Sequence, residues 1–179
     1  MELALSTCTI RSWRLDDVDA LVRHANNRAV WRNLRDSFPH PYTRDDAEEW
    51  LASAGSQTPE TNFAIDVDGE AVGGIGLERK TDVFRRSVEI GYWLGERVWG
   101  RGIATEAVAA LTTWGFTNLD VVRIYAGVFE WNPASIRVLE KVGYAFEGRL
   151  HNAVYKDGEV LDELVYATWP EHWREQREH

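Results

Sequence analysis

Two closely spaced glycines are the first feature of this sequence that could do chemistry. Gly100 and Gly102 lie between an expected strand and an expected helix, where glycine allows positive φ angles and close approach of a ligand to the backbone. The helix that follows adds its unpaired N–H groups and the positive end of its dipole. Arg97 and Arg101 add positive charge. Segment 97–102 therefore predicts a site for an anion such as a diphosphate.

The anion site at this loop could belong to one of two known nucleotide-binding motifs, or the loop could bind nothing. A P-loop needs the string G-x-x-x-x-G-K-[ST], which is absent. A dinucleotide fingerprint needs a third small residue where Thr105 stands, and a second crossover unit that the chain lacks. A tight turn with no ligand is the remaining alternative.

The elements that position this loop follow from hydrophobic periodicity and turn residues. We expect a strand at 7–12, a helix at 15–26, an irregular segment at 28–42, and a helix that opens at Thr43 with Asp46 as a weak capping box. Strands at 62–67 and 70–78 flank Asp68-Gly69, which is a strong hairpin signal. A polar loop at 79–86 comes next.

The second half of the chain predicts a crossover unit. A strand at 87–94, a helix at 103–118 and a strand at 123–129 follow one another, so the two strands should lie side by side and parallel. A helix at 133–142 should stop at Gly143, and a hairpin at Asp157-Gly158 should have its second strand at 159–168. This order predicts an α+β fold with a mixed α/β sheet.

Composition limits the function classes. The 179 residues suit a single domain over 1–179, with 44% hydrophobic and 27% charged residues. No apolar run approaches the roughly 20 residues that cross a bilayer, and the single cysteine, Cys8, excludes an internal disulfide framework, so we expect a reduced, cytoplasmic protein. A net charge of -9 argues against binding of nucleic acid and suits a cationic partner such as an amine. The five histidines show no ligand spacing, so no metal site is expected.

Several motifs in a fixed order resemble one known family. They are Arg97-x-x-Gly100-x-Gly102, then Asn132-x-x-Ser135, then Glu140-Lys141-x-Gly143-Tyr144, with the runs EIGYWL at 89–94 and GRGIATEA at 100–107. Together they are similar to the GCN5-related N-acetyltransferase (GNAT) superfamily, and more narrowly to its RimJ/RimL-like branch, which acetylates ribosomal-protein N-termini. The resemblance covers nearly the whole chain. It implies a twisted, mostly antiparallel sheet with one splayed parallel strand pair, flanked by helices.

The same resemblance implies acetyl-CoA as the cofactor. The loop and helix start should receive the diphosphate, and the backbone of residues 92–94 should pair with the pantetheine arm between the splayed strands. Asn132 should reach the pantetheine or the acetyl end, or else only cap the helix before Pro133. The implied cofactor-binding residues are Tyr92, Trp93, Leu94, Arg97, Val98, Trp99, Gly100, Arg101, Gly102, Ile103, Ala104, Thr105, Asn132 and Ser135.

Acetyl transfer to an amine requires a base, a stabilised oxyanion and a proton donor for the thiolate. Glu89 is the candidate base, acting through water, because a carboxylate inside an apolar strand needs a role or a partner; its alternative is an ion pair with an arginine such as Arg85 or Arg86. Ser135 is the donor that the branch implies, since the tyrosine that many superfamily members use is Leu139 here. Its alternative is a helix serine bonded to its own backbone. The branch's other proposed base falls near Val154, which leaves the base open.

The acceptor should be bound opposite the cofactor by the irregular segment 26–42. The candidate residues are Trp31, Arg35, Phe38, His40 and Tyr42, with packing of a loop over the sheet as the alternative for each. We expect direct attack by a primary amine, either a protein N-terminus or a small molecule, in a ternary complex. A non-catalytic acyl-CoA binding or sensing module is the second hypothesis, and a nucleotide-binding oxidoreductase is the third. The branch also implies a possible homodimer, which nothing in the sequence demonstrates.

Overall fold

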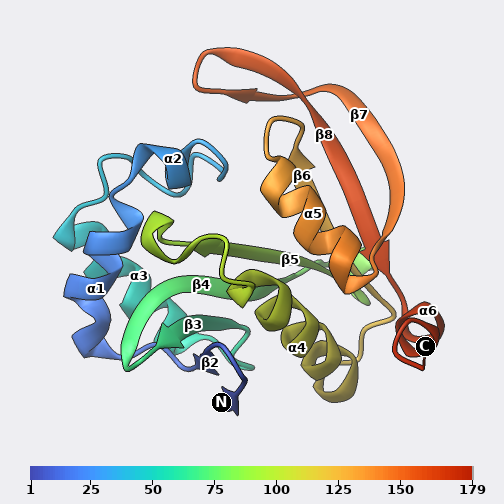
Figure 1. Cartoon of the computed structure of the whole chain (residues 1–179), viewed down its shortest axis with the longest axis horizontal. Coiled ribbons are helices and arrows are strands. Elements are labelled where there is room, and N and C mark those ends of the chain that lie inside the picture. The colour runs from blue at the N-terminus through green and yellow to red at the C-terminus, as the bar shows by residue number, and fades with distance from the viewer. Residues whose placement is uncertain (179) are drawn as a thin grey trace. The chain divides into compact units, whose positions relative to one another are not determined.

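The computed structural model describes residues 1–178 (Figure 1). Its strands are β1 Glu2–Ala4, β2 Thr9–Arg11, β3 Asn62–Val67, β4 Glu70–Arg79, β5 Ser87–Leu94, β6 Arg123–Phe129, β7 Ala145–Lys156 and β8 Glu159–Thr168. Its helices are α1 Val18–Ala25, α2 Arg28–Trp31, α3 Arg44–Ser56, α4 Ile103–Asn118, α5 Pro133–Val142 and α6 Pro170–Glu175, with 3-10 turns at Leu15–Asp17, Asp82–Phe84 and Glu96–Val98.

All eight strands belong to one sheet in the order β1-β2-β3-β4-β5-β6-β8-β7. β5 and β6 form the parallel pair, as the crossover unit predicts, and the sheet is otherwise mostly antiparallel. This confirms the predicted fold class. The chain divides into two compact units, residues 1–76 with 92–107, and residues 77–91 with 108 onward. The expectation of a single domain over 1–179 stays a prediction.

Turn and cap residues determine several element boundaries. Asp68 and Gly69 have φ angles of 54° and 88°, and Asp157 and Gly158 have 51° and 83°, the positive angles that a two-residue hairpin turn requires. Thr43 Oγ1 accepts from the Asp46 N–H at 3.2 Å, and Asp46 Oδ2 accepts from the Thr43 N–H at 2.7 Å. Both predicted hairpins and the predicted capping box are therefore present.

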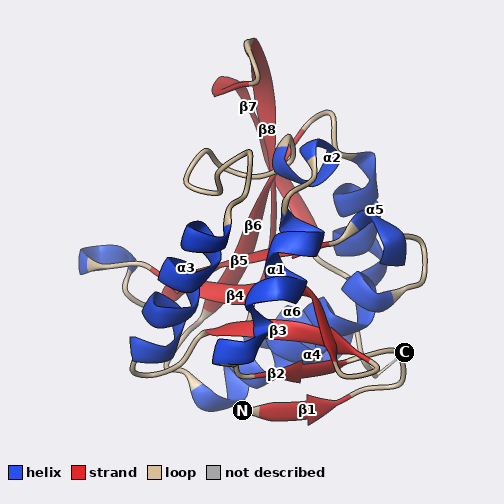
Figure 2. Ribbon diagram, turned by 90° about the vertical axis from the view of Figure 1, so that its left-hand side faces the viewer, coloured by secondary structure: helices blue, strands red, loops and turns tan. Residues whose placement is uncertain are grey.

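In the first unit, α1 and α3 contact each other and lie in front of β3 and β4 in Figure 2. Their facing residues form one apolar cluster, which contains Val18, Leu21, Ala25, Tyr42, Ala47 and Leu51, with Trp13, Val22, Phe38 and Trp93 packed against it. Burial of this cluster holds the two helices against each other and supports the segment between them.

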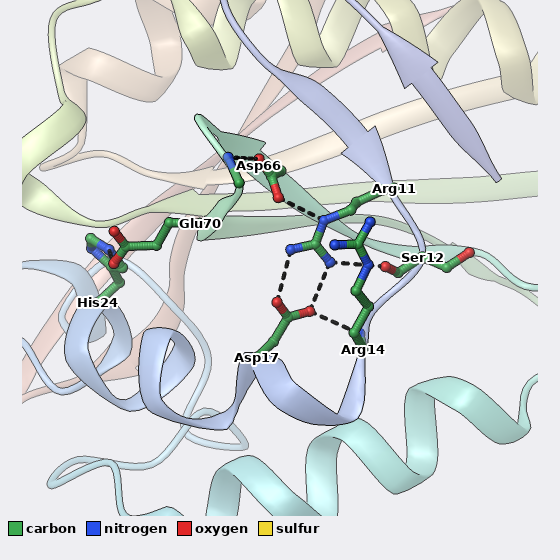
Figure 3. Close-up of polar contacts among 8 residues, drawn as sticks. Arg11, Ser12, Arg14, Asp17, His24, Asp66 and Glu70 are labelled. Carbon is green, nitrogen blue, oxygen red and sulfur yellow. Dashed lines mark hydrogen bonds and ion pairs between the residues drawn. The ribbon is translucent and has the colours of Figure 1, made fainter.

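A buried arginine joins β2, β3 and the turn before α1 (Figure 3). Arg11, only 3% exposed, donates through Nε to Asp66 Oδ2 at 2.7 Å and through Nη1 and Nη2 to the two carboxylate oxygens of Asp17, each at 2.8 Å. Asp17 also accepts from the Arg14 N–H. Because each buried charge has an opposite partner, the cluster ties the start of α1 to the sheet without an unpaired ion.

In the second unit, β8 pairs with β6 on one side and with β7 on the other, and β7 and β8 form the long hairpin coloured orange and red in Figure 1. The hydroxyls of Thr112 on α4 and Tyr144 are 2.7 Å apart, and Trp173 on α6 donates to Thr113 at 3.3 Å. Gly143 has a φ of 94°, so α5 ends at the predicted glycine. Among residues 1–178, no helix combines the length and the apolar character that crossing a bilayer requires.

Candidate active site

The glycine loop before α4 has the backbone that an anion site needs. Gly100 and Gly102 have φ angles of 75° and 81°, and a Cβ built on either would have no atom within 4 Å. Val98 and Ile103 are buried on either side and anchor the loop, while Arg97 and the loop glycines are exposed. The space above the two glycines is therefore open to a ligand at the start of α4.

Glu106 in the first turn of α4 fixes this helix start to the turn between β1 and β2. Its Oε1 accepts from the backbone N–H and hydroxyl of Ser6 at 2.8 and 2.7 Å, and its Oε2 accepts from the Thr7 N–H at 2.8 Å and from the Thr7 hydroxyl. Burial alone would raise the pKa of Glu106, but these hydrogen bonds lower it to about 2. The carboxylate is thus held ionised, and its position sets where the first turn of α4 lies.

Beside Arg97 there is a cavity of about 250 Å³ lined by Arg23, His24, Asn27, Glu96 and Arg97. Asn27 Nδ2 donates to Glu96 Oε2 at 2.7 Å, which ties the end of α1 to the turn before the glycine loop. His24 Nε2 lies 2.9 Å from Glu70 Oε1 (Figure 3). Because Arg23 pairs with Glu70 and Glu96 lines the same cavity, positive and negative charges are mixed beside the loop.

The end of β5 offers backbone groups on one edge. The Gly95 N–H donates to the Val72 carbonyl at 2.8 Å, so by strand alternation Trp93 and Gly95 turn their polar groups toward β4. Tyr92 and Leu94 turn theirs to the opposite edge, where the Leu94 carbonyl accepts from Trp99 Nε1 at 2.8 Å. This is the edge on which a ligand carrying amides would pair.

In the second unit, the parallel pairing of β5 and β6 is short. The paired residues are Ser87 with Arg123, Val88 with Ile124 and Glu89 with Tyr125; among the described residues no further β5–β6 pair follows, although β6 continues to Phe129. The other edge of β6 stays paired with β8 from Ile124 to Phe129. The two strands therefore splay after Glu89 and Tyr125, as the family resemblance implies.

Glu89 lies at the last paired position, and its side chain is 12% exposed. Lys80 Nζ donates to Glu89 Oε2 at 2.8 Å and to Glu78 Oε1 at 2.9 Å, and the Tyr125 hydroxyl donates to Glu89 Oε2 at 3.4 Å. Burial works against the charge of Lys80, yet the hydrogen bonds to Glu89 and Glu78 raise its pKa above the usual value. Glu89 therefore forms an ion pair, which is the alternative to its catalytic role, and the partner in that pair is Lys80.

Asn132 caps α5. Its Oδ1 accepts from the Ser135 N–H at 3.2 Å, directly before Pro133. This confirms the capping interpretation, and it uses only the carbonyl oxygen of the amide, since within residues 1–178 the Nδ2 group has no hydrogen-bond partner. Asn132 and Ser135 are both half-buried, so each side chain retains some access.

The candidate acceptor residues fall into two aromatic groups in the first unit. Tyr42 is 5% exposed, and Phe38 packs against it and against Trp93 with ring centroids 5.0 and 5.4 Å apart. Burial, together with the charge of Asp46, raises the pKa of Tyr42 to about 12. Tyr42 therefore packs into the core, and packing was the alternative to acceptor binding for this residue.

The second group is more open. Trp31 and His40 have ring centroids 5.6 Å apart, and the Arg28 guanidinium lies 5.9 Å from the Trp31 ring. His40 and Arg35 are exposed. Acceptor binding by any of the five residues stays a prediction.

Comparison with known proteins decides the family. Residues 8–145 match the family model described as an acetyltransferase (GNAT) domain. The chain belongs to the GNAT acetyltransferase family. It is therefore an N-acetyltransferase, and acetyl-CoA is its acetyl donor.

Relatives and solved structures agree with this family. An uncharacterized N-acetyltransferase, p20, of Bacillus licheniformis is 29% identical over 162 residues, which are 89% of this chain and 90% of that protein. A spermidine N(1)-acetyltransferase of Escherichia coli (strain K12) is 30% identical over 105 residues, 59% of this chain and 56% of that protein. A RimL ribosomal L7/L12 alpha-N-protein acetyltransferase in complex with coenzyme A superposes with a TM-score of 0.84 at 21% identity, over 96% of this chain and 99% of that chain, which shows the shared fold.

In this GNAT acetyltransferase the local residues fit the cofactor. The open backbone at Gly100 and Gly102 suits a diphosphate, and the end of β5 at Tyr92 and Leu94 has the backbone N–H and C=O groups with which a chain of amides pairs. Sequence reasoning missed Lys80, Tyr125 and Glu106. Tyr125 becomes a neighbour of Glu89 only through the register of β5 and β6, and Lys80 only because the chain after β4 lies against the start of β5. Glu106 finds its partners about a hundred residues earlier in the chain.

Proposed function

We propose that this GNAT acetyltransferase moves an acetyl group from acetyl-CoA to a primary amine by direct attack, with both substrates bound at once. The observation that carries the proposal is the open, positive-φ backbone of Gly100 and Gly102 at the start of α4 in a chain of this family. Backbone N–H groups are the donors that a diphosphate needs, and only glycine leaves them this accessible.

The other cofactor contacts follow from the same elements. The N–H groups of residues 100–103 bind the diphosphate, because those of Val98 and Trp99 already donate to the Gly95 and Glu96 carbonyls. Arg97 and Arg101 supply charge, and the backbone at Tyr92 and Leu94 pairs with the pantetheine amides. Asn132 offers its Nδ2 group as a further donor, because its Oδ1 is already used by the helix cap. The remaining proposed contacts are Val98, Trp99, Ile103, Ala104 and Thr105 around the helix start.

The residues of this chain supply the acid–base chemistry. Glu89 accepts, through a water molecule, the proton that the acceptor nitrogen loses. A backbone N–H in the open part of β5 stabilises the oxyanion. Ser135 donates a proton to the departing thiolate. No covalent enzyme intermediate is involved, since the one thiol, Cys8, is buried directly before β2.

For the acceptor we propose a protein N-terminus or a small cationic amine. The fold shared with a ribosomal-protein acetyltransferase favours a protein N-terminus, and the sequence similarity to a spermidine acetyltransferase favours a small amine. The net charge of -9 attracts either. Trp31, Arg35, Phe38, His40 and Tyr42 come from the segment that we assign to the acceptor. Membership of the RimJ/RimL-like branch, a cytoplasmic location and a homodimer belong to the same proposal.

The test is thiol release from acetyl-CoA with a panel of acceptors, read alongside the mass of each product. The panel holds spermidine, amino sugars, amino acids and peptides that copy ribosomal-protein N-termini. We expect one class to gain the mass of an acetyl group at a rate well above hydrolysis. Binding of acetyl-CoA with no release for any amine would contradict the proposal and favour a sensing module. Binding of NAD but not of coenzyme A would favour an oxidoreductase.

A further inference from the structure

A lysine that sequence analysis assigned to a polar loop lies against the proposed base. Lys80 follows β4 directly, and its Nζ bridges Glu89 at 2.8 Å and Glu78 at 2.9 Å. The Lys80 side chain is 25% exposed, and of its two partners Glu89 is the buried one and Glu78 the exposed one. Its interaction with Glu89 is therefore the less screened of the two.

Charged and titratable groups from two strands and one loop surround this carboxylate. β6 contributes the Tyr125 hydroxyl, 3.4 Å from Glu89 Oε2, and Arg123, whose guanidinium lies 5.4 Å from the Tyr125 ring centroid and pairs with Glu147. Lys80 Nζ lies 5.8 Å from the same ring. Of the two cations, Lys80 donates to the Glu89 carboxylate, whereas Arg123 donates to Glu147.

The position of Glu89 in the sheet determines where its carboxylate lies relative to β5 and β6. Glu89 and Tyr125 are the last paired residues of β5 and β6, so the carboxylate lies where the two strands begin to splay. A carboxylate with little exposure takes up a proton at a higher pH unless a cation compensates the burial. A base must be unprotonated to act, and it must be held in one orientation.

We propose that Lys80 is a positioning residue that keeps Glu89 ionised and oriented at the splay of β5 and β6. The inference rests on the proposed role of Glu89 as the base. Lys80 keeps its own proton throughout and acts only through Glu89. Tyr125 supports the same carboxylate oxygen from the neighbouring strand.

If the role of Lys80 were purely structural, it would tie the chain after β4 to β5 without changing the proton affinity of Glu89. The pH dependence of kcat/KM therefore separates the two roles. In Lys80→Met we expect the acidic limb of kcat/KM, measured with acetyl-CoA and the acceptor selected by the amine panel, to move up by about 1–2 pH units. Lys80→Arg keeps the charge, so its limb should stay near that of the wild type. Lys141→Met removes a cation from the last turn of α5 and is the control for net charge; its profile should not move.

A titration that needs no acceptor keeps the inference testable if turnover is lost. In protein labelled with 13C at glutamate carboxyls, the Glu89 signal, assigned from Glu89→Gln, should titrate at higher pH in Lys80→Met and in Lys80→Gln than in the wild type. Lys80→Gln retains a hydrogen-bond donor, so it tests the charge rather than the contact.

The outcomes separate this inference from the proposed function. If Glu89→Gln turns over like the wild type, Glu89 is not the base and the proposed mechanism fails. If Glu89→Gln is inactive but neither the acidic limb nor the Glu89 signal moves in Lys80→Met, the base stands and the role of Lys80 is refuted.

Discussion

Gly102→Glu is the substitution that most sharply separates the binding role of the glycine loop from its conformational role. Gly102 has a φ of 81°, and a Cβ there would meet no atom within 4 Å. The new side chain therefore causes strain but no clash in the free protein. Its carboxylate would stand in the open space that we assign to the diphosphate.

The magnitudes follow from these two features. A non-glycine residue in the left-handed region costs about 1–2 kcal/mol of folding free energy. A carboxylate about 5 Å from a phosphate charge opposes it by about 3 kcal/mol per unit charge at an effective dielectric constant of about 20. This alone weakens binding by about a hundredfold or more. Folding should thus suffer mildly and binding of coenzyme A severely.

The matched control is Gly158→Glu in the turn between β7 and β8. Gly158 has a φ of 83° and equally open surroundings, so strain and added charge are the same while the glycine loop is untouched. The assay is urea unfolding of both variants, with coenzyme A affinity measured by calorimetry. We expect similar losses of stability, and loss of affinity in Gly102→Glu alone. Equal affinity in the two variants would refute the assignment of the loop.

Three further predictions concern single residues. Asn132→Ala should destabilise the protein by about 1 kcal/mol through loss of the α5 cap, whereas Asn132→Asp keeps the capping oxygen and should keep stability in urea while weakening coenzyme A binding; equal stability of both variants would contradict the cap. Ser135→Ala should lower kcat with little change in the KM for acetyl-CoA, because the cap uses the Ser135 N–H and not its hydroxyl, and an unchanged kcat would remove Ser135 from the mechanism. Glu106 has its pKa lowered from 4.5 to about 2 by Ser6 and Thr7 against the opposing effect of burial, so its contribution to stability is present above pH 4.5 and is lost as the pH falls toward 2. Unfolding midpoints at about pH 5 and about pH 3 should therefore differ less in Glu106→Gln than in the wild type, and an identical difference would disprove the linkage.

Local signals in the sequence were sufficient for most elements and for the glycine loop. Asp68-Gly69 and Asp157-Gly158 need positive φ angles that few residues tolerate, so each marks a hairpin without knowledge of the rest of the fold. The same physics predicted the open backbone at Gly100 and Gly102, because a loop between a strand and a helix leaves its N–H groups unpaired.

Features that depend on distant contacts were not predictable. β1 is three residues long and exists through pairing with β2, and α2 is a single turn capped by Asn27, so neither shows a periodic pattern. The partner of Glu89 was expected among arginines, yet Lys80 pairs with it, because the chain directly after β4 lies against the start of β5. The contact of Glu106 with Ser6 and Thr7 depends on where the first turn of α4 falls in space, which no local pattern encodes.

The most direct measurement is a crystal structure of the wild-type protein with coenzyme A. The account predicts diphosphate oxygens that accept hydrogen bonds from backbone N–H groups of residues 100–103, at Gly100, Gly102 and the start of α4. A diphosphate bound elsewhere, with the start of α4 left to solvent, would contradict the account.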